Sequence, residues 1–274
     1  MWAWRVVSSA LAALWLGGAA AAGPPDRVVS INLCTDQLAM LLAAPGQLVS
    51  VSYLARDPRS SAMAEAAEAW PVNGGTAEDI FLLAPDLVVA GSFTTPETVR
   101  MLERLGIPVV LFPPATSLQD VGAQLRQMAA VLGRPEAGAA AAAEFEAALS
   151  DLAAEEEGPT AALYQAGGWT GGRHSLAGEI LAAAGLRNLA VDLGMEQGGW
   201  LALEQLVLAQ PELLVTGRPF PGASRAEEIT GHPALRRGLP GRAGVALTDR
   251  DWVCGLPHVL DAIRAMQAAA EPLR

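Results

Sequence analysis

The sequence predicts an α/β protein of two Rossmann-like lobes, in which each lobe has a mainly parallel sheet and a ligand cleft lies between the lobes. Three observations lead to this prediction. Short runs rich in β-branched residues alternate with helical segments, which is the pattern of βαβ units. A long Ala-rich helical stretch lies in the middle of the chain, and one helix–strand unit recurs in the second half.

The first 22 residues have the composition of a secretory signal peptide. Arg5 supplies the positive charge, residues 6–16 form a short apolar segment, and an Ala-rich cleavage site precedes Gly23. The alternative is a membrane anchor, but the apolar segment is shorter than the roughly 20 residues that span a bilayer. We therefore expect residues 1–22 to be removed and the mature protein to be soluble in the periplasm.

Residues 23–134 are expected to form the N-terminal lobe. Its predicted strands cover residues 27–32, 48–53, 86–90 and 108–112, and a helix with Thr35 as its cap is predicted over residues 35–44. Asp36 is expected to serve as a helix-cap residue.

Residues 135–157 are expected to form the helix that connects the lobes. The segment is rich in Ala, begins after a break at Gly133, and ends in three Glu followed by Gly158 and Pro159. Strand patterns resume at 160–165, 212–216 and 243–247, so residues 158–274 are expected to form the C-terminal lobe.

An internal repeat supports two related lobes. Residues 76–91 (TAEDIFLLAPDLVVAG) and 202–217 (ALEQLVLAQPELLVTG) align without gaps at an offset of 126, with six of sixteen positions identical. Helix–strand units can resemble one another by convergence. However, the shared residues include Glu78 and Glu204, which open helices at surface positions where packing does not require a carboxylate.

The tryptophans of the mature chain lie in connections rather than within helices. Trp70 precedes a Pro, Trp169 and Trp200 each follow Gly-Gly, and Trp252 follows the last predicted strand. Ligands of open α/β sheets bind beyond the carboxyl ends of the strands. We therefore predict that these tryptophans line an aromatic cleft, the alternative being that some complete the lobe cores.

Two further aromatic residues follow strands of the first lobe, so both are expected at the same edge. Tyr53 is predicted to be a ligand contact, and Phe93 lies in an equivalent place after the strand at 86–90.

Composition excludes several functions. The net charge is −11, no Lys occurs and no Arg cluster is present, so nucleic acid is not an expected partner. The three His are far apart in the sequence, although His174 could face the cleft, and no metal site is predicted. No G-x-S-x-G elbow or phosphate loop occurs, so we predict no catalytic residues, no cofactor and no enzyme activity. Cys34 and Cys254 could form one disulfide or remain two thiols.

The chain resembles the periplasmic substrate-binding proteins of ABC importers for cobalamin and ferric siderophores, in which a rigid helix joins two lobes. The resemblance covers nearly all of the mature chain and rests on RVVSIN-LCTDQL, LGIPVVLF, the connecting helix and the two Glu-led helices before APDLVVAG and QPELLVTG. It implies that Glu78 and Glu204 dock onto Arg residues of two permease subunits.

The segment LTDRDW resembles a cobalamin-binding pattern built on a cleft Asp–Trp pair, here Asp251 and Trp252. That pattern continues to an Arg where this chain has Gly255. The resemblance implies a monomeric protein that captures a bulky metal chelate (cobalamin, ferric siderophore or haem) and delivers it to an inner-membrane permease dimer. The alternatives are a metal-ion binding protein of an importer and an exported chelatase-like enzyme of similar fold.

Overall fold

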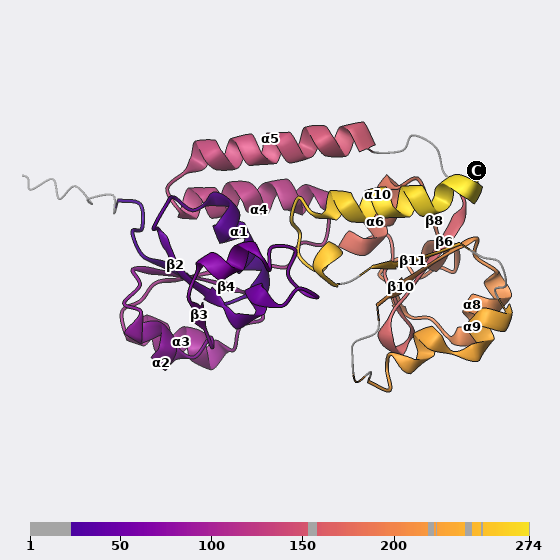
Figure 1. Ribbon diagram of the computed structural model, residues 1–274, viewed down its shortest axis with the longest axis horizontal. Helices are drawn as coiled ribbons and strands as arrows, with labels where there is room; N and C mark the ends of the chain where they lie inside the picture. The colour runs from indigo at the N-terminus through magenta and orange to yellow at the C-terminus, as the bar shows by residue number, and fades with distance from the viewer. Residues whose placement is uncertain are drawn as a thin grey trace, which may run out of the picture.

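The structure is a computed structural model that describes residues 23–152, 158–218, 222, 224–238, 243–247 and 249–273. The expected signal peptide, residues 1–22, and the end of the expected connecting helix, residues 153–157, lie outside these ranges. Two parallel sheets with helices around them form an N-terminal and a C-terminal lobe, as predicted, and lie side by side along the long axis (Figure 1). None of the described helices has both the length and the apolar content that a membrane span requires.

The N-terminal sheet has the strand order β3-β2-β1-β4-β5. Its strands are β1 (Val28–Ser30), β2 (Leu48–Ser52), β3 (Val72–Asn73), β4 (Leu87–Gly91) and β5 (Val109–Phe112), and its helices are α1 (Leu33–Leu42), α2 (Ala77–Leu82) and α3 (Pro96–Arg104). The order of the strands reverses between β1 and β4. In parallel sheets this switch point opens a crevice at the carboxyl ends of the strands.

The C-terminal sheet has the strand order β11-β10-β6-β8, with its switch point between β6 and β10. Its strands are β6 (Thr160–Tyr164), β8 (Arg187–Asn188), β10 (Leu213–Gly217) and β11 (Ala243–Leu247), and a separate antiparallel pair joins β7 (Trp169–Thr170) to β9 (Gly199–Trp200). The helices are α6 (Leu176–Ala183), α7 (Leu189–Asp192), α8 (Leu203–Ala209), α9 (Pro233–Gly238) and α10 (Val259–Ala270).

Two helices connect the lobes. Helix α4 (Leu118–Val131) packs against α5 (Pro135–Leu152), and α5 leads toward the C-terminal lobe (Figure 1). Helix α4 contacts α1 of the first lobe and α6 of the second, while α10 packs on both α5 and α6. One buried apolar cluster therefore runs through both lobes, and each sheet keeps a smaller second cluster on its other face.

Strand residues alternate between these clusters. Val28 and Val89 face the shared core and Val29 faces the smaller cluster of the first lobe, whereas Leu163 and Tyr164 divide in the same way in the second. This period of two follows from the pleat of a strand. Both faces are buried, as expected for a parallel sheet.

The internal repeat is confirmed as a structural one. Helix α2 and strand β4 match α8 and β10 at the offset of 126, and each helix is followed by a residue with positive φ, Ala84 (φ 47°) and Gln210 (φ 51°). These are the two non-Gly residues with positive φ in the described ranges. A left-handed residue costs a side chain about 1–2 kcal/mol, so its occurrence at the same point of both copies favours duplication over convergence.

Hydrogen bonds repeat as well. The carboxylate of Asp86 accepts from the backbone N–H of Arg27, and that of Glu212 accepts from the N–H of Thr160 at the equivalent place in the second lobe. In both copies the acidic residue holds the start of the neighbouring strand.

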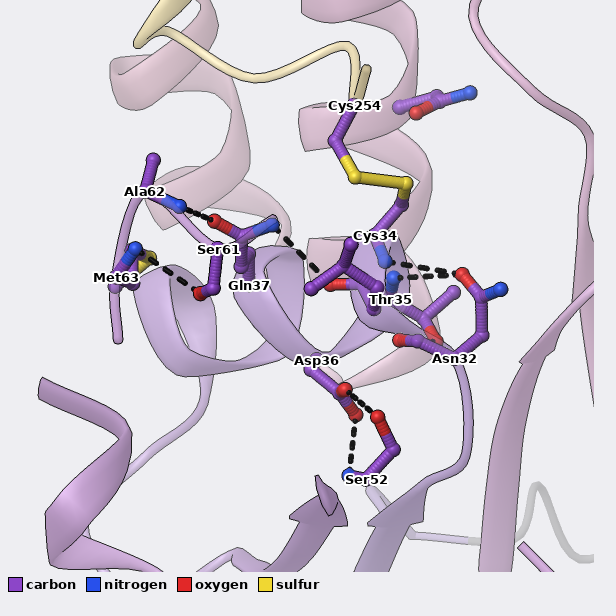
Figure 2. The surroundings of a disulfide bond; sticks show 12 residues. Asn32, Cys34, Thr35, Asp36, Gln37, Ser52, Ser61, Ala62, Met63 and Cys254 are labelled. Atoms are coloured by element: carbon purple, nitrogen blue, oxygen red, sulfur yellow. Dashed lines mark hydrogen bonds between the residues drawn. A yellow bond between two sulfur atoms is a disulfide. The ribbon is translucent and has the colours of Figure 1, made fainter. Parts of the chain in front are cut away.

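Helix α1 begins earlier than predicted. Its cap is Asn32, whose side-chain oxygen accepts from the N–H groups of Cys34 and Thr35 at 3.0 and 3.4 Å (Figure 2). The prediction of Thr35 as the cap is therefore wrong. Its hydroxyl lies inside the first turn, where it bonds to Ser30 of β1 at 2.8 Å.

The prediction for Asp36 is also wrong, because this carboxyl is fully buried rather than at a helix cap. It accepts from the N–H of Ser52 at 3.0 Å and bonds to its hydroxyl at 2.5 Å, which ties α1 to β2 (Figure 2). Burial raises the pKa of Asp36 to about 6, although the bonds from Ser52 oppose the shift.

Cys34, in the same turn, is joined to Cys254 of the C-terminal lobe by a disulfide with a Cα–Cα distance of 5.2 Å (Figure 2). Of the two alternatives left open by the sequence, the structure has the bonded form. The bond closes a loop between residues 220 apart and lies at the carboxyl end of β1.

Replacing Cys254 by Ser should lower the free energy of unfolding by roughly 3–5 kcal/mol, because a cross-link over so long a loop strongly restricts the unfolded chain. Chemical denaturation with and without reductant measures the loss. Thiol titration of the denatured, unreduced wild type should find no free thiol, and two per chain would contradict the bond.

Asp36→Asn should make stability less dependent on pH. The unfolded carboxyl releases its proton near its ordinary pKa of 3.8, whereas the folded one holds it up to about 6. Wild-type stability should therefore fall by about 3 kcal/mol as the pH rises from about 4 to 7. Urea denaturation at both ends of that range checks this, and an equal fall in the variant would contradict it.

Candidate functional site

A cavity of about 230 Å³ lies at the carboxyl end of β6, beside the switch point of the C-terminal sheet. Its lining includes Ala115, Gln165, Trp169, Ser175, Trp252 and Val253. Ala115 belongs to the segment between β5 and α4, so both halves of the chain contribute to the wall. Two of the predicted ligand residues, Trp169 and Trp252, come together here.

Trp169, which lines this cavity, forms a pair with Trp200, and we call these two rings the aromatic rim. Trp169 of β7 and Trp200 of β9 are direct cross-strand partners, with ring centroids 5.1 Å apart at an angle of 80°. They are 42% and 76% exposed. Large exposed aromatic side chains gathered in this way mark a binding surface.

Glycines place the two rings. Gly168 has φ 80°, and a Cβ on it would lie 2.9 Å from the carbonyl oxygen of Leu201. Gly199 has φ 147°. Side chains at either position would strain or push apart the short β7–β9 pair, so the two Gly-Gly-Trp segments serve to bring the rings into contact.

Trp252 contributes to the wall but is only 7% exposed and belongs to the shared core. Its loop is closely packed, because Gly255 approaches Ala115 so nearly that a Cβ at position 255 would lie 2.2 Å from the Ala115 Cβ. Cys254 between them is bonded to Cys34. The connection after β11 therefore packs as part of the core, which its sequence did not reveal.

The other predicted ligand residues lie outside this cavity lining. Trp70 is half-buried against the shared core, and its carbonyl accepts from the guanidinium of Arg56 at 2.7 Å. Tyr53 is 61% exposed at the end of β2. Asp251 is paired with Arg250 at 3.5 Å.

Phe93 is 86% exposed just after β4, at the same edge of the N-terminal sheet as Tyr53. It was not among the predicted ligand contacts. The rule that selected Tyr53, an aromatic residue directly after a strand, had nevertheless placed Phe93 at this edge, and the structure agrees.

The polar side chains that line the cavity, Gln165 and Ser175, carry no charge. Tyr164, at the end of β6, faces the smaller cluster of the C-terminal lobe rather than this cavity, and its buried hydroxyl has no hydrogen-bond partner within the described residues. Burial raises the pKa of this hydroxyl, and the carboxylate of Glu204 raises it further. The group therefore stays protonated and can donate a hydrogen bond.

A second cavity, of about 390 Å³, lies between α6 and the β8–α7 segment. His174, which the sequence left as a residue that could face the cleft, lines this second cavity and is not among the residues that line the first. Its arginines, Arg173 and Arg187, are paired with Glu196 and Asp192 at 3.0 and 3.1 Å. Because these charges satisfy one another, the first cavity is the better ligand site despite its smaller volume.

The described residues contain no group of three or more His, Cys, Asp or Glu arranged to hold a metal ion. His232 lies before α9, where its ring accepts from the N–H of Ala234, and the half-buried His258 precedes α10. Burial lowers the pKa of His258.

Glu78 and Glu204 occupy the first turns of α2 and α8, and both are exposed. The two helices lie in different lobes, toward opposite ends of the molecule and away from the α4–α5 pair (Figure 1). Neither residue has an ion pair among those of the described part of the chain.

Comparisons with known proteins identify relatives over most of this fold. A family model described as periplasmic binding protein matches residues 28–237. The Vitamin B12-binding protein of Pectobacterium carotovorum subsp. carotovorum (strain PC1) is 29% identical over 217 residues, which cover 74% of this chain and 76% of that protein. That of Yersinia pestis (strain Pestoides F) is 28% identical over 199 residues, covering 69% of each chain.

Solved structures are similar over nearly the whole chain. The periplasmic heme-binding protein RhuT from Roseiflexus sp. RS-1 is 25% identical with a TM-score of 0.68, over 89% of this chain and 99% of that one. The periplasmic Vitamin B12 binding protein BtuF of Vibrio cholerae has a TM-score of 0.67 at 21% identity, over 91% and 98%, and shows a common fold.

Proposed function

The chain belongs to the periplasmic binding protein family, and we propose that it captures a bulky metal chelate in the periplasm and delivers it to an inner-membrane ABC permease. The observation that carries this proposal is the exposed Trp169–Trp200 pair, of which Trp169 lines a cavity beside the switch point of a parallel sheet. The protein acts as a monomer, exported by residues 1–22, and does no chemistry on its ligand.

The size of the cavity supports a ligand that is only partly enclosed. A volume of about 230 Å³ is below the roughly 300–1,000 Å³ of pockets that enclose a drug-sized molecule. The cavity therefore receives one edge of the ligand. The remainder lies over exposed aromatic rings such as Trp200.

The lining supports a flat ligand whose buried part is uncharged. Trp169 and Trp252 offer ring surfaces, and the polar groups around them are the neutral side chains of Gln165 and Ser175. Tetrapyrrole-like rings or aromatic chelators stack on such surfaces. Cobalamin is the first candidate because the similar proteins of Pectobacterium and Yersinia are Vitamin B12-binding proteins. Haem and ferric siderophores are the other candidates.

One departure from the cobalamin pattern has a structural reason. The pattern has an Arg where this chain has Gly255, and the contact with Ala115 leaves no room for a side chain there. If cobalamin is the ligand, it is held without that Arg, through the aromatic rings and the Asp251–Trp252 segment.

We further propose that Glu78 and Glu204 dock onto basic residues of two permease subunits. Each is exposed on a helix of the repeat, so the lobes offer equivalent carboxylates to a partner with two equivalent subunits. Exposed charges of this kind mainly set encounter rate and orientation.

Trp169→Ala and Trp200→Ala should each weaken ligand binding by about 1–3 kcal/mol, because each removes an aromatic anchor from the rim. Titration calorimetry against cobalamin, haemin and a ferric siderophore measures the loss and identifies the ligand. Trp252→Ala is the matched comparison: it should also lower the free energy of unfolding by roughly 3–5 kcal/mol, since it empties a core position. Wild-type affinity for every ligand in both rim variants would contradict the site.

The double variant Glu78→Ala/Glu204→Ala should keep its ligand affinity and lose uptake through the permease, because docking loses both carboxylates while the cavity is unchanged. Uptake of labelled ligand into cells measures this. The control is Glu103→Ala/Glu144→Ala, which removes the same charge from exposed positions outside the repeat. Normal uptake by the first variant would refute the docking role.

A further inference from the structure

The two copies of the repeat share an exposed leucine as well as a glutamate. Leu82 and Leu208 occupy equivalent positions and are 81% and 82% exposed. Other apolar positions of the repeat behave in the opposite way, since Ile80 and its equivalent Leu206 are both fully buried. The duplication therefore preserves a leucine in each lobe that contributes little to the core.

Each leucine lies one helical turn after the glutamate of its copy. Residues four apart share one face of an α-helix, so Glu78 and Leu82 form one small patch on α2, and Glu204 and Leu208 form the other on α8. The left-handed residue two positions after each leucine ends the helix, which leaves the leucine in the last turn. In the N-terminal patch Phe81, 51% exposed, adds further apolar surface.

We propose that Leu82 and Leu208 are paired apolar anchors that insert into two equivalent sockets of a homodimeric membrane permease, each socket combining an apolar pocket with a basic side chain. This inference rests on the proposed function for the identity of the partner. It adds to the two carboxylates a buried contact on each lobe.

Three features favour a homodimeric permease as the partner of these two patches. The two patches carry the same chemistry in different lobes, which matches a partner that presents one surface twice. They lie toward opposite ends of the molecule, so one small partner could not cover both (Figure 1). A second copy of this chain is disfavoured, because its net charge is −11 and its matching patches would place glutamates against each other.

The glutamates should mainly affect the association rate with the permease, and the leucines the dissociation rate. Exposed carboxylates steer encounter, so their removal mainly slows association and its effect shrinks as salt screens the charges. A leucine buried in the partner holds the complex after encounter, so its removal mainly speeds dissociation. Affinity differences among variants of one interface arise mostly in the dissociation rate.

The first test places a photo-crosslinking amino acid at position 82 or at position 208 of the full-length protein in cells. Both positions should capture the same transmembrane polypeptide, identified by mass spectrometry, and a chain carrying both probes should capture two copies of it. The same probe at Leu193, an exposed residue outside the patches, should not. Capture of a second copy of this chain, of two different polypeptides, or of none would overturn the proposal.

The second test measures binding to that membrane complex in nanodiscs. Leu82→Gln and Leu208→Gln should each speed dissociation about tenfold, and the double variant about a hundredfold, with little dependence on salt. Leu41→Gln and Leu193→Gln are the controls, since both residues are exposed apolar positions outside the repeat. Unchanged dissociation of the double variant would overturn the proposal.

Ligand titration of the same double variant separates the two levels of inference. If cobalamin, haemin and ferric siderophore all fail to bind while both positions capture one transmembrane polypeptide, the ligand assignment fails and the anchors stand. If a ligand binds normally but the two positions share no partner, the anchors fail and the capture function stands.

Discussion

The first turn of α1 links more parts of the molecule than any other segment described above. Thr35 bonds to β1, Asp36 to β2 and Gln37 to the N–H of Ala62, while Cys34 is bonded to the C-terminal lobe. The turn starts directly after β1, at the switch point of the N-terminal sheet. The sheet therefore fixes the position of this turn, and the disulfide holds the loop after β11 next to the turn.

A connection of this kind limits how the lobes can move. The shared apolar core already joins them through α4, α5 and α10, and the disulfide adds a covalent link on the side of the candidate cavity. Loss of hinge freedom lowers the entropy cost of capturing a ligand, because fewer groups have to be ordered on binding. The close contact of Gly255 with Ala115 belongs to the same arrangement, since it packs the Cys254 loop onto the segment after β5.

Much of this architecture follows from local patterns in the sequence. Strands of four or five residues with buried faces, the Ala-rich helices and the repeat all show a clear period, and their positions agree with the structure. The strands β3, β7 and β9 have two residues each and are too short to show a hydrophobic period. Features that depend on distant contacts were less clear: the burial of Asp36 against Ser52 was missed, and core packing of Trp252 was left only as an alternative.

The same reasoning explains why the candidate site was only partly predictable. A tryptophan after Gly-Gly indicates a ring in a connection, but it does not show whether that ring contacts a second one. The Trp169–Trp200 contact depends on the pairing of two strands that are about thirty residues apart in the sequence. The pairing of Cys34 with Cys254 depends on the placement of two lobes, which no local pattern contains.

The two lobes are similar in their repeated helices and strands but differ at the carboxyl edges of their sheets. Their repeated helices share the left-handed turn, the strand-holding carboxylate and the exposed Glu and Leu. The carboxyl edges of the two sheets differ, because the exposed Tyr53 and Phe93 follow strands of one sheet and the Trp169–Trp200 pair lies beyond a strand of the other. A ligand without two-fold symmetry requires unlike walls, whereas a partner built from two identical subunits requires like surfaces. The proposed capture and docking roles therefore place opposite demands on the two lobes, and the chain meets each demand with a different set of residues.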